Sequence, residues 1–261
     1  MSAVPAPNLN PGMNPAQPIL EVEQVSKRFG NFQALKDVTV GFETGRLTAI
    51  IGPNGAGKST FFNVVSGAFA PTSGRIRFLG RDITGLASHE FARIGIAKSF
   101  QITNVFRQLS AHENVRVAAQ MRQSRFALLR SRGSMTELID RADALLARVG
   151  LASSRDKSAG DLAHGQQRAL EVAMALAAEP VLLLMDEPTA GMSPEETGVM
   201  MELISSLAAE RTVILVEHKM KMVMNLCQRL IVLHHGELLA EGTPDDIRAN
   251  DEVRRVYLGK N

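Results

Sequence analysis

A glycine-rich segment, GPNGAGKST, places one lysine and two hydroxyl side chains at fixed spacing between Gly52 and Thr60. Its glycines let backbone N–H groups curl around phosphate oxygens, and Lys58 can reach the β and γ phosphates. Ser59 stands where a helix begins, so its hydroxyl can bind Mg²⁺ while the helix dipole favours the anion. The segment therefore predicts a phosphate-binding loop whose contacts to a nucleotide come from Asn54, Gly55, Gly57, Lys58, Ser59 and Thr60.

Two adjacent carboxylates follow the apolar run VLLLM, much further along the chain. The carboxyl end of a buried strand is where open α/β sheets bind their ligands. At such a position Asp186 can hold the Mg²⁺ shell, and Glu187 can orient or deprotonate an attacking water. Acidic residues can also simply end a strand. Together with the phosphate-binding loop, however, this pair predicts hydrolysis of a nucleoside triphosphate.

The elements that must position these residues are visible in the apolar pattern. The run LTAII (47–51) is a buried strand that feeds the loop, and residues 58–66 read as a helix ended by Gly67. Further on, helices and strands alternate over 165–178, 181–185, 194–209, 212–216, 219–228 and 230–233. This alternation predicts a mostly parallel sheet covered by helices.

The remaining segments have different patterns. Alternating apolar residues over 20–42 and the segment RIRFLG (75–80) predict further strands, whereas residues 102–160 have a helical pattern. We therefore expect a helical subdomain that interrupts an α/β one. Residues 1–18 hold five prolines and no charge, so we expect a disordered tail there.

Composition excludes several classes of partner. With 29 Lys and Arg against 27 Asp and Glu, the net charge of +2 is too small to attract nucleic acid, and we expect no nucleic-acid partner. The longest apolar runs fall far short of the ~20 residues that cross a bilayer, and the start lacks the features of a secretory signal. A single cysteine, Cys227, fits a reducing compartment, and its apolar surroundings favour a buried small hydrophobe.

Over residues 19–261 the chain resembles an ATPase subunit of an ABC transporter. The resemblance rests on the order and spacing of GPNGAGKST, Gln101, LAHGQQR (162–168), LLLMDEP and the pair Glu217-His218. No guanine-reading NKxD motif is present, so the implied nucleotide is ATP. The implied fold is α/β: a RecA-like P-loop NTPase core over 19–101 and 163–261, with an antiparallel β-subdomain and an inserted α-helical subdomain at about 102–162.

The resemblance also assigns roles to individual residues. Phe29 resembles the aromatic residue that stacks on adenine, although it could instead be a strand phenylalanine facing the core. Gln101 resembles the residue that contacts Mg²⁺ or the attacking water, and its alternative is a loop glutamine. His218 resembles the switch histidine that contacts the γ-phosphate, and its alternative is a structural histidine. The implied catalytic set is Lys58, Gln101, Glu187 and His218, and the implied metal set is Ser59, Gln101 and Asp186.

Two positions depart from the usual ABC pattern. Where the signature normally reads LSGGQ, this chain has Leu162-Ala163-His164-Gly165-Gln166, which lacks the serine hydroxyl. Backbone N–H groups at a helix N-terminus can still face a phosphate, so we expect Ala163, Gly165 and Gln166 to contact ATP held by a second subunit. Ser193 stands where aspartate is usual, and the sequence SPEE predicts a helix N-cap with a capping box more firmly than a contact across a dimer.

Flanking segments narrow the resemblance to the LivG-type subunits of branched-chain amino acid importers. These segments are QITNVFRQLSAHENV, AGMSPEET, VEHKMKMV and the tail EGTPDDIRANDEVRRVYLG. The implied partners are membrane permease subunits, a second ABC ATPase that is either a LivF-like paralogue or an identical chain, and indirectly a periplasmic substrate-binding protein. The implied location is cytoplasmic, on the inner face of the inner membrane. Other amino acids, amides, urea and aromatic acids are alternative cargoes.

Two rival functions remain open at this point. An ABC ATPase that acts on nucleic acid or ribosomes predicts a second cassette, a coiled coil or a basic extension, and the sequence shows none. A nucleotide-dependent regulatory module with weak hydrolysis is suggested by Ala163 in the signature.

Overall fold

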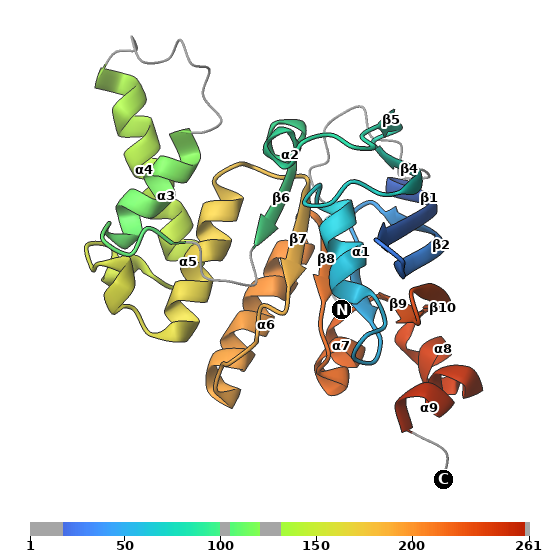
Figure 1. Cartoon of the computed structure of the whole chain (residues 1–261). Coiled ribbons are helices and arrows are strands. Elements are labelled where there is room, and N and C mark those ends of the chain that lie inside the picture. Colours follow the sequence, from blue (N-terminus) through green and yellow to red (C-terminus); the bar gives the residue numbers. More distant parts are fainter. Residues whose placement is uncertain (1–17, 100–104, 121–131, 259–261) are drawn as a thin grey trace.

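The computed structural model describes residues 18–99, 105–120 and 132–258, which form two β-sheets and the helices around them (Figure 1). The smaller sheet has the strand order β2-β1-β4-β5 and is antiparallel. Its strands are β1 (Pro18–Phe29), β2 (Phe32–Glu43), β4 (Ser73–Phe78) and β5 (Arg81–Asp82). The expected tail falls on residues outside the described part, except for Pro18, which begins β1.

The larger sheet has the strand order β10-β9-β3-β8-β7-β6, and its strands are parallel except for β10, which forms a hairpin with β9. The strands are β3 (Leu47–Ile51), β6 (Ile96–Ser99), β7 (Leu182–Asp186), β8 (Thr212–Val216), β9 (Arg229–His234) and β10 (Glu237–Gly242). The predicted strand at 181–185 is therefore displaced by one residue, so that Asp186 ends β7. The prediction of a mostly parallel sheet is confirmed.

Helices surround the larger sheet, and α3 and α4 stand on the side away from β1 and β2, with α5 between them and the sheet (Figure 1). The helices are α1 (Lys58–Val65), α2 (Ser88–Ile94), α3 (Ala111–Gln120), α4 (Arg132–Arg148), α5 (His164–Leu176), α6 (Pro194–Ala208), α7 (Met220–Leu226), α8 (Pro244–Ala249) and α9 (Asp251–Leu258). None of the helices in the described segments is long and apolar enough to cross a membrane.

Two hydrophobic cores lie on opposite faces of the larger sheet because successive side chains of a strand point to opposite sides. In β8, Ile214 and Val216 join the core formed with α1 and the smaller sheet, whereas Val213 and Leu215 join the core formed with α5 and α6. Strands β3, β7 and β8 are buried at every residue, as their continuous apolar runs predict. This double coverage fixes the strand ends to which the candidate site is attached.

Cys227 lies directly after α7 rather than inside the predicted helix 219–228, which is shorter than expected. Its side chain is buried, and this burial raises the pKa of the thiol to about 12. The expectation of a buried small hydrophobe is confirmed.

Candidate nucleotide site

The phosphate-binding loop joins β3 to α1 and exposes its central residues. Gly57 has φ +95°, and a Cβ there would lie 2.8 Å from the carbonyl oxygen of Ala34, so the position needs glycine. Asn54, Gly55 and Ser59 are exposed around this turn. The first turn of α1 leaves backbone N–H groups without intrahelical partners, which suits the turn to an anion.

Lys58 lies inside the loop rather than on its surface. Its side chain is buried, and Nζ donates hydrogen bonds to the carbonyl oxygens of Gly52 at 2.7 Å and Pro53 at 3.0 Å. Burial lowers the pKa of this amine, while the carboxylates of Glu187 and Asp186 act in the opposite direction. The ammonium group is therefore held between the loop and the acidic end of β7.

Asp186 is the last residue of β7 and is 3% exposed. Burial raises the pKa of its carboxyl to about 6, against the opposing effect of Lys98. Its Oδ1 atom is buried and has no hydrogen-bond partner within the described segments. Because buried polar atoms are almost always paired, this oxygen fits a site that takes an additional ligand, such as a hard cation or its water.

Glu187 and His218 meet where β7 and β8 end. Glu187 has a left-handed backbone at φ +45°, and its N–H donates to the carbonyl of Val216 at 2.9 Å. His218 Nδ1 lies 3.8 Å from Glu187 Oε1, and the imidazole is about half exposed. Positive φ at a non-glycine residue is uncommon and is concentrated at functional sites. The two strand ends thus place a carboxylate and an imidazole beside the phosphate-binding loop.

The structure brings together Lys58, Asp186, Glu187 and His218, as the sequence predicts, while Gln101 lies outside the described residues. Lys98 on β6 was not predicted as a site residue from the sequence; its Nζ donates to Asn63 Oδ1 of α1 at 2.8 Å and to Ser66 Oγ, directly after α1, at 3.3 Å. Four residues with a central lysine give no clear strand signal, so this position had no pattern from which to find it.

Phe29 ends β1 and is 44% exposed, so the alternative of a core phenylalanine is wrong. Its ring meets Phe69 edge to face at 5.5 Å between centroids, and Lys27 Nζ lies 5.1 Å from the Phe29 centroid. These contacts orient the Phe29 ring while leaving much of it open to a planar ligand. Stacking on adenine stays a prediction.

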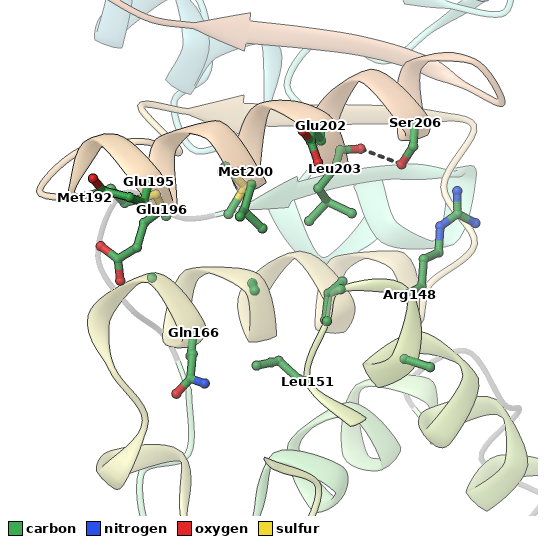
Figure 2. A pocket seen from close by; sticks show the side chains of 16 residues that line it. Arg148, Leu151, Gln166, Met192, Glu195, Glu196, Met200, Glu202, Leu203 and Ser206 are labelled. Carbon is green, nitrogen blue, oxygen red and sulfur yellow. Dashed lines mark hydrogen bonds between the residues drawn. The ribbon is translucent and has the colours of Figure 1, made fainter. Parts of the chain in front are cut away.

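The signature segment lies at the start of α5. Ala163 and His164 are exposed, and the N–H of Ala163 donates to Gln166 Oε1 at 3.2 Å. A Cβ on Gly165 would lie 2.5 Å from Glu196 Oε1, so this glycine permits close approach of α5 to the start of α6. Figure 2 shows Glu196 extending from α6 toward α5.

The start of α6 is fixed by the capping box that the sequence predicts. Ser193 Oγ accepts from the N–H of Glu196 at 3.2 Å, and Glu196 Oε2 accepts from the N–H of Ser193 at 3.0 Å. Pro194 occupies the first helical turn. Glu196 therefore connects two segments, because its side chain both caps α6 and lies close to Gly165 of the signature segment.

Beyond this contact, α5, α6 and the end of α4 line a groove of about 570 Å³ (Figure 2). Its lining includes the apolar residues Leu151, Ala169 and Leu203, and Arg148 lies at the end away from Glu195. The groove begins at the contact between Gly165 and Glu196 and runs along α6 as far as Ser206.

Comparison with known proteins places this geometry in a family. The ABC transporter family model matches residues 35–190, and the model for branched-chain amino acid ATP-binding cassette transporters matches residues 237–261. The chain is 40% identical over 253 residues to a high-affinity branched-chain amino acid transport ATP-binding protein, BraF, of Pseudomonas aeruginosa, and 39% identical over 253 residues to LivG of Escherichia coli. Each match covers 94% of this chain and 99% of the relative.

A solved structure agrees with these matches. The ADP conformation of an ATP-binding cassette of an ABC transporter superposes with a TM-score of 0.82 at 30% identity, covering 94% of this chain and 100% of the other. The expected α/β fold of a P-loop ABC ATPase is confirmed. Since one family model spans more than half of the chain and the relatives are matched along nearly their whole length, the chain belongs to the ABC transporter family of nucleotide-binding ATPase subunits.

Proposed function

We propose that this chain hydrolyses ATP to energise an importer for branched-chain or related amino acids. The proposal is supported by two relatives that share 39–40% identity and are named as branched-chain amino acid transport proteins. The match of the specialised family model to residues 237–261 adds support from a separate part of the chain. Hydrolysis is supported by the arrangement of Glu187 and His218, 3.8 Å apart, beside Lys58 and Asp186.

ATP binding would use the phosphate-binding loop and the exposed ring of Phe29. Lys58 would exchange its loop carbonyls for phosphate oxygens, and the backbone N–H groups at the start of α1 would hold the anion. Ser59 and Asp186 would hold Mg²⁺, with Gln101 as a further expected ligand, because hydroxyl and carboxylate oxygens are the donors that this ion prefers. The metal would supply charge neutralisation at the phosphates.

The chemical step would use the two strand ends. Glu187 would orient the attacking water and accept its proton, while His218 would donate a hydrogen bond to the γ-phosphate. Lys58 would stabilise negative charge that develops on the phosphate oxygens.

The signature residues lie at the N-terminal end of α5: Ala163, Gly165 and Gln166. They would therefore contact ATP only across an interface with another subunit. We infer a second ABC ATPase, either a LivF-like paralogue or an identical chain, whose ATP these residues cover. Membrane permeases would receive the resulting movement at the cytoplasmic face of the inner membrane, and a periplasmic binding protein would deliver cargo to them. No nucleic-acid partner is expected.

The test is transport by the assembled complex. The chain is co-purified with its membrane and ATPase partners, reconstituted in vesicles with ATP inside, and supplied with labelled leucine and the co-purified or co-encoded binding protein. We expect leucine uptake that requires ATP and stops in the Glu187→Gln variant. ATP-dependent uptake of an unrelated solute alone would contradict the cargo, and ATP binding without hydrolysis in the complete complex would favour a regulatory module.

A further inference from the structure

A fully buried carboxylate, Glu217, joins the segments that follow β7 and β8. Its Oε1 accepts from the Thr189 hydroxyl at 2.6 Å and from the Thr189 N–H at 3.4 Å. Its Oε2 accepts from the N–H groups of His218 at 3.1 Å and Lys219 at 3.5 Å. Both oxygens are thus engaged, which is the condition under which a buried charge is tolerated.

The Thr189 end of this network belongs to the turn that carries Glu187. Thr189 is completely buried, and the N–H of Ala190 donates to the carbonyl of Glu187 at 3.0 Å within the same turn. Lys219, in the segment after β8, makes a second connection: its Nζ donates a hydrogen bond to the carbonyl of Thr189 at 3.1 Å. The turn after β7 is therefore bonded to the segment after β8 through both side chains and backbone.

At its other end, the network holds the backbone of His218, from which the imidazole side chain extends. Because Glu217 binds the N–H of His218, the backbone of the histidine is held on the same carboxylate as the turn that follows Glu187. His218 and Glu187 come from different strands, and His218 Nδ1 lies 3.8 Å from Glu187 Oε1.

We propose that Glu217 and Thr189 are positioning residues for ATP hydrolysis: their hydrogen bond fixes His218 relative to Glu187. This inference rests on the proposed roles of Glu187 and His218. It predicts that breaking the Thr189–Glu217 bond slows the chemical step and leaves nucleotide binding in place, because neither side chain belongs to the phosphate-binding loop.

A matched control lies at the opposite end of β8. Thr212 is 1% exposed, and its hydroxyl accepts a hydrogen bond from the N–H of Gly45 at 2.9 Å. Thr212→Val therefore removes one buried hydrogen bond from the same strand, as Thr189→Val does from the turn beside its other end. The two variants differ in their distance from Glu187 and His218 and in the lost partner: the Thr189 hydroxyl donates to a carboxylate, whereas the Thr212 hydroxyl accepts from a backbone N–H.

The experiment compares full-length Thr189→Val, Thr189→Ser, Glu217→Gln and Thr212→Val in the assembled complex. Because a hydrogen bond to a charged group is worth a factor of ~10 to 100, we expect Thr189→Val and Glu217→Gln to lower kcat by about that much. The Kd for a fluorescent ATP analogue should stay within about 3-fold of wild type in every variant. Thr189→Ser, which keeps the hydroxyl, and Thr212→Val should retain kcat within about 3-fold.

Two further readouts separate positioning from general loss of stability. The double variant Thr189→Val/Glu217→Gln should be less slow than the product of the two single effects, because both changes act on the Thr189–Glu217 hydrogen bond. Hydrogen–deuterium exchange in residues 188–193 and 217–221 should rise together in Thr189→Val but not in Thr212→Val. This second readout does not depend on activity, and Thr189→Val carries the test where Glu217→Gln does not fold.

Three results would overturn the positioning role: equal slowing in Thr212→Val, a Thr189→Ser variant as slow as Thr189→Val, or additive effects in the double variant. Normal hydrolysis in Thr189→Val beside an active wild type would also overturn it, while leaving the proposed function intact. An inactive wild-type complex would instead contradict the proposed function, and the exchange experiment would then decide the structural coupling.

Discussion

The carboxyl edge of the larger sheet and the N-terminal end of α5 differ in how deeply their candidate functional residues are buried. At the sheet edge, Lys58, Asp186 and Glu217 are each less than a tenth exposed. Strands β7 and β8, which end at Asp186 and just before Glu217, are buried at every residue. At the start of α5, Ala163 and His164 face outward, and the main internal constraint is the close approach of Gly165 to Glu196. The residues of the sheet edge lie close to one another within this chain, whereas the start of α5 is an exposed helix end.

This difference separates two kinds of functional residue. Substitutions at the sheet edge are expected to affect the isolated chain, because its residues already meet one another. Substitutions at the start of α5 are expected to leave the isolated chain's nucleotide binding intact and to act only in the assembled complex. Each variant below tests one side of this division.

Lys58→Ala should have the largest effect. It removes the cation inside the phosphate-binding loop, and truncating one partner of a buried charge pair costs enough to weaken binding by ~100-fold or more. The measurement is titration of the isolated chain with a fluorescent ATP analogue. Lys36→Ala is the control, since this exposed lysine forms an ion pair with Glu237 on the surface. Affinity within a few-fold of wild type in Lys58→Ala would refute the assignment of the loop.

Gly165→Asp should abolish hydrolysis in the complex while the isolated chain still binds nucleotide. The new Cβ would meet Glu196 Oε1 at 2.5 Å, and a second negative charge would be added there, so the start of α5 must move. Gly198→Asp is a matched control, because a Cβ on Gly198 of α6 meets nothing within 4 Å. Retention of most of the hydrolysis by Gly165→Asp would show that the start of α5 takes no part in the site.

Asp186→Asn should change the pH dependence of stability in metal-free solution. In the folded chain the pKa of this carboxyl is raised from 3.8 to about 6, so the fold favours the protonated form and loses stability as pH rises from about 4 through 6. The full loss is on the order of 3 kcal/mol, about half of it above pH 5, and it should be missing in the asparagine variant. Urea unfolding in EDTA at pH 5 and pH 8 measures the difference, and identical pH profiles for the two chains would contradict it.

Ala163→Ser should have the smallest effect, confined to the complex. One restored neutral hydrogen bond is worth roughly 0.5–1.5 kcal/mol, or about 2- to 13-fold in rate if it acts wholly in the transition state. Steady-state hydrolysis by the reconstituted complex measures it. A gain of several hundredfold would mean that the natural site is impaired, and the regulatory alternative would then replace transport as the function.

Local sequence signals were sufficient to predict the strands that form the sheet edge, but not the contacts between the segments that follow those strands. The runs at 47–51 and 212–216 became β3 and β8 with the expected bounds, because buried parallel strands are read from continuous apolar residues. The bond between Thr189 and Glu217 joins residues 28 positions apart, and no periodicity or motif carries that information. Phe29 likewise needed the structure, since a strand residue can point to either of two faces.

In the signature region, too, a local feature could be predicted from the sequence but a contact between helices could not. The sequence predicted the capping box of Ser193 and Glu196 because such caps are local. It could not show that Glu196 also lies against Gly165, which is a contact between two helices. Helix α8 had a comparable local signal, Thr243 followed by Pro244 and Asp246, and could have been predicted in the same way.

The most direct test of the central claim is single-turnover hydrolysis by the complex containing Glu187→Gln. Removing the base leaves charge neutralisation by Lys58 and the metal ligands in place, so ATP should stay bound and unhydrolysed, and the two ATPase subunits should remain associated. We predict nucleotide affinity close to wild type with the chemical step blocked. Turnover at the wild-type rate would contradict the account, because another residue would then have to activate the water.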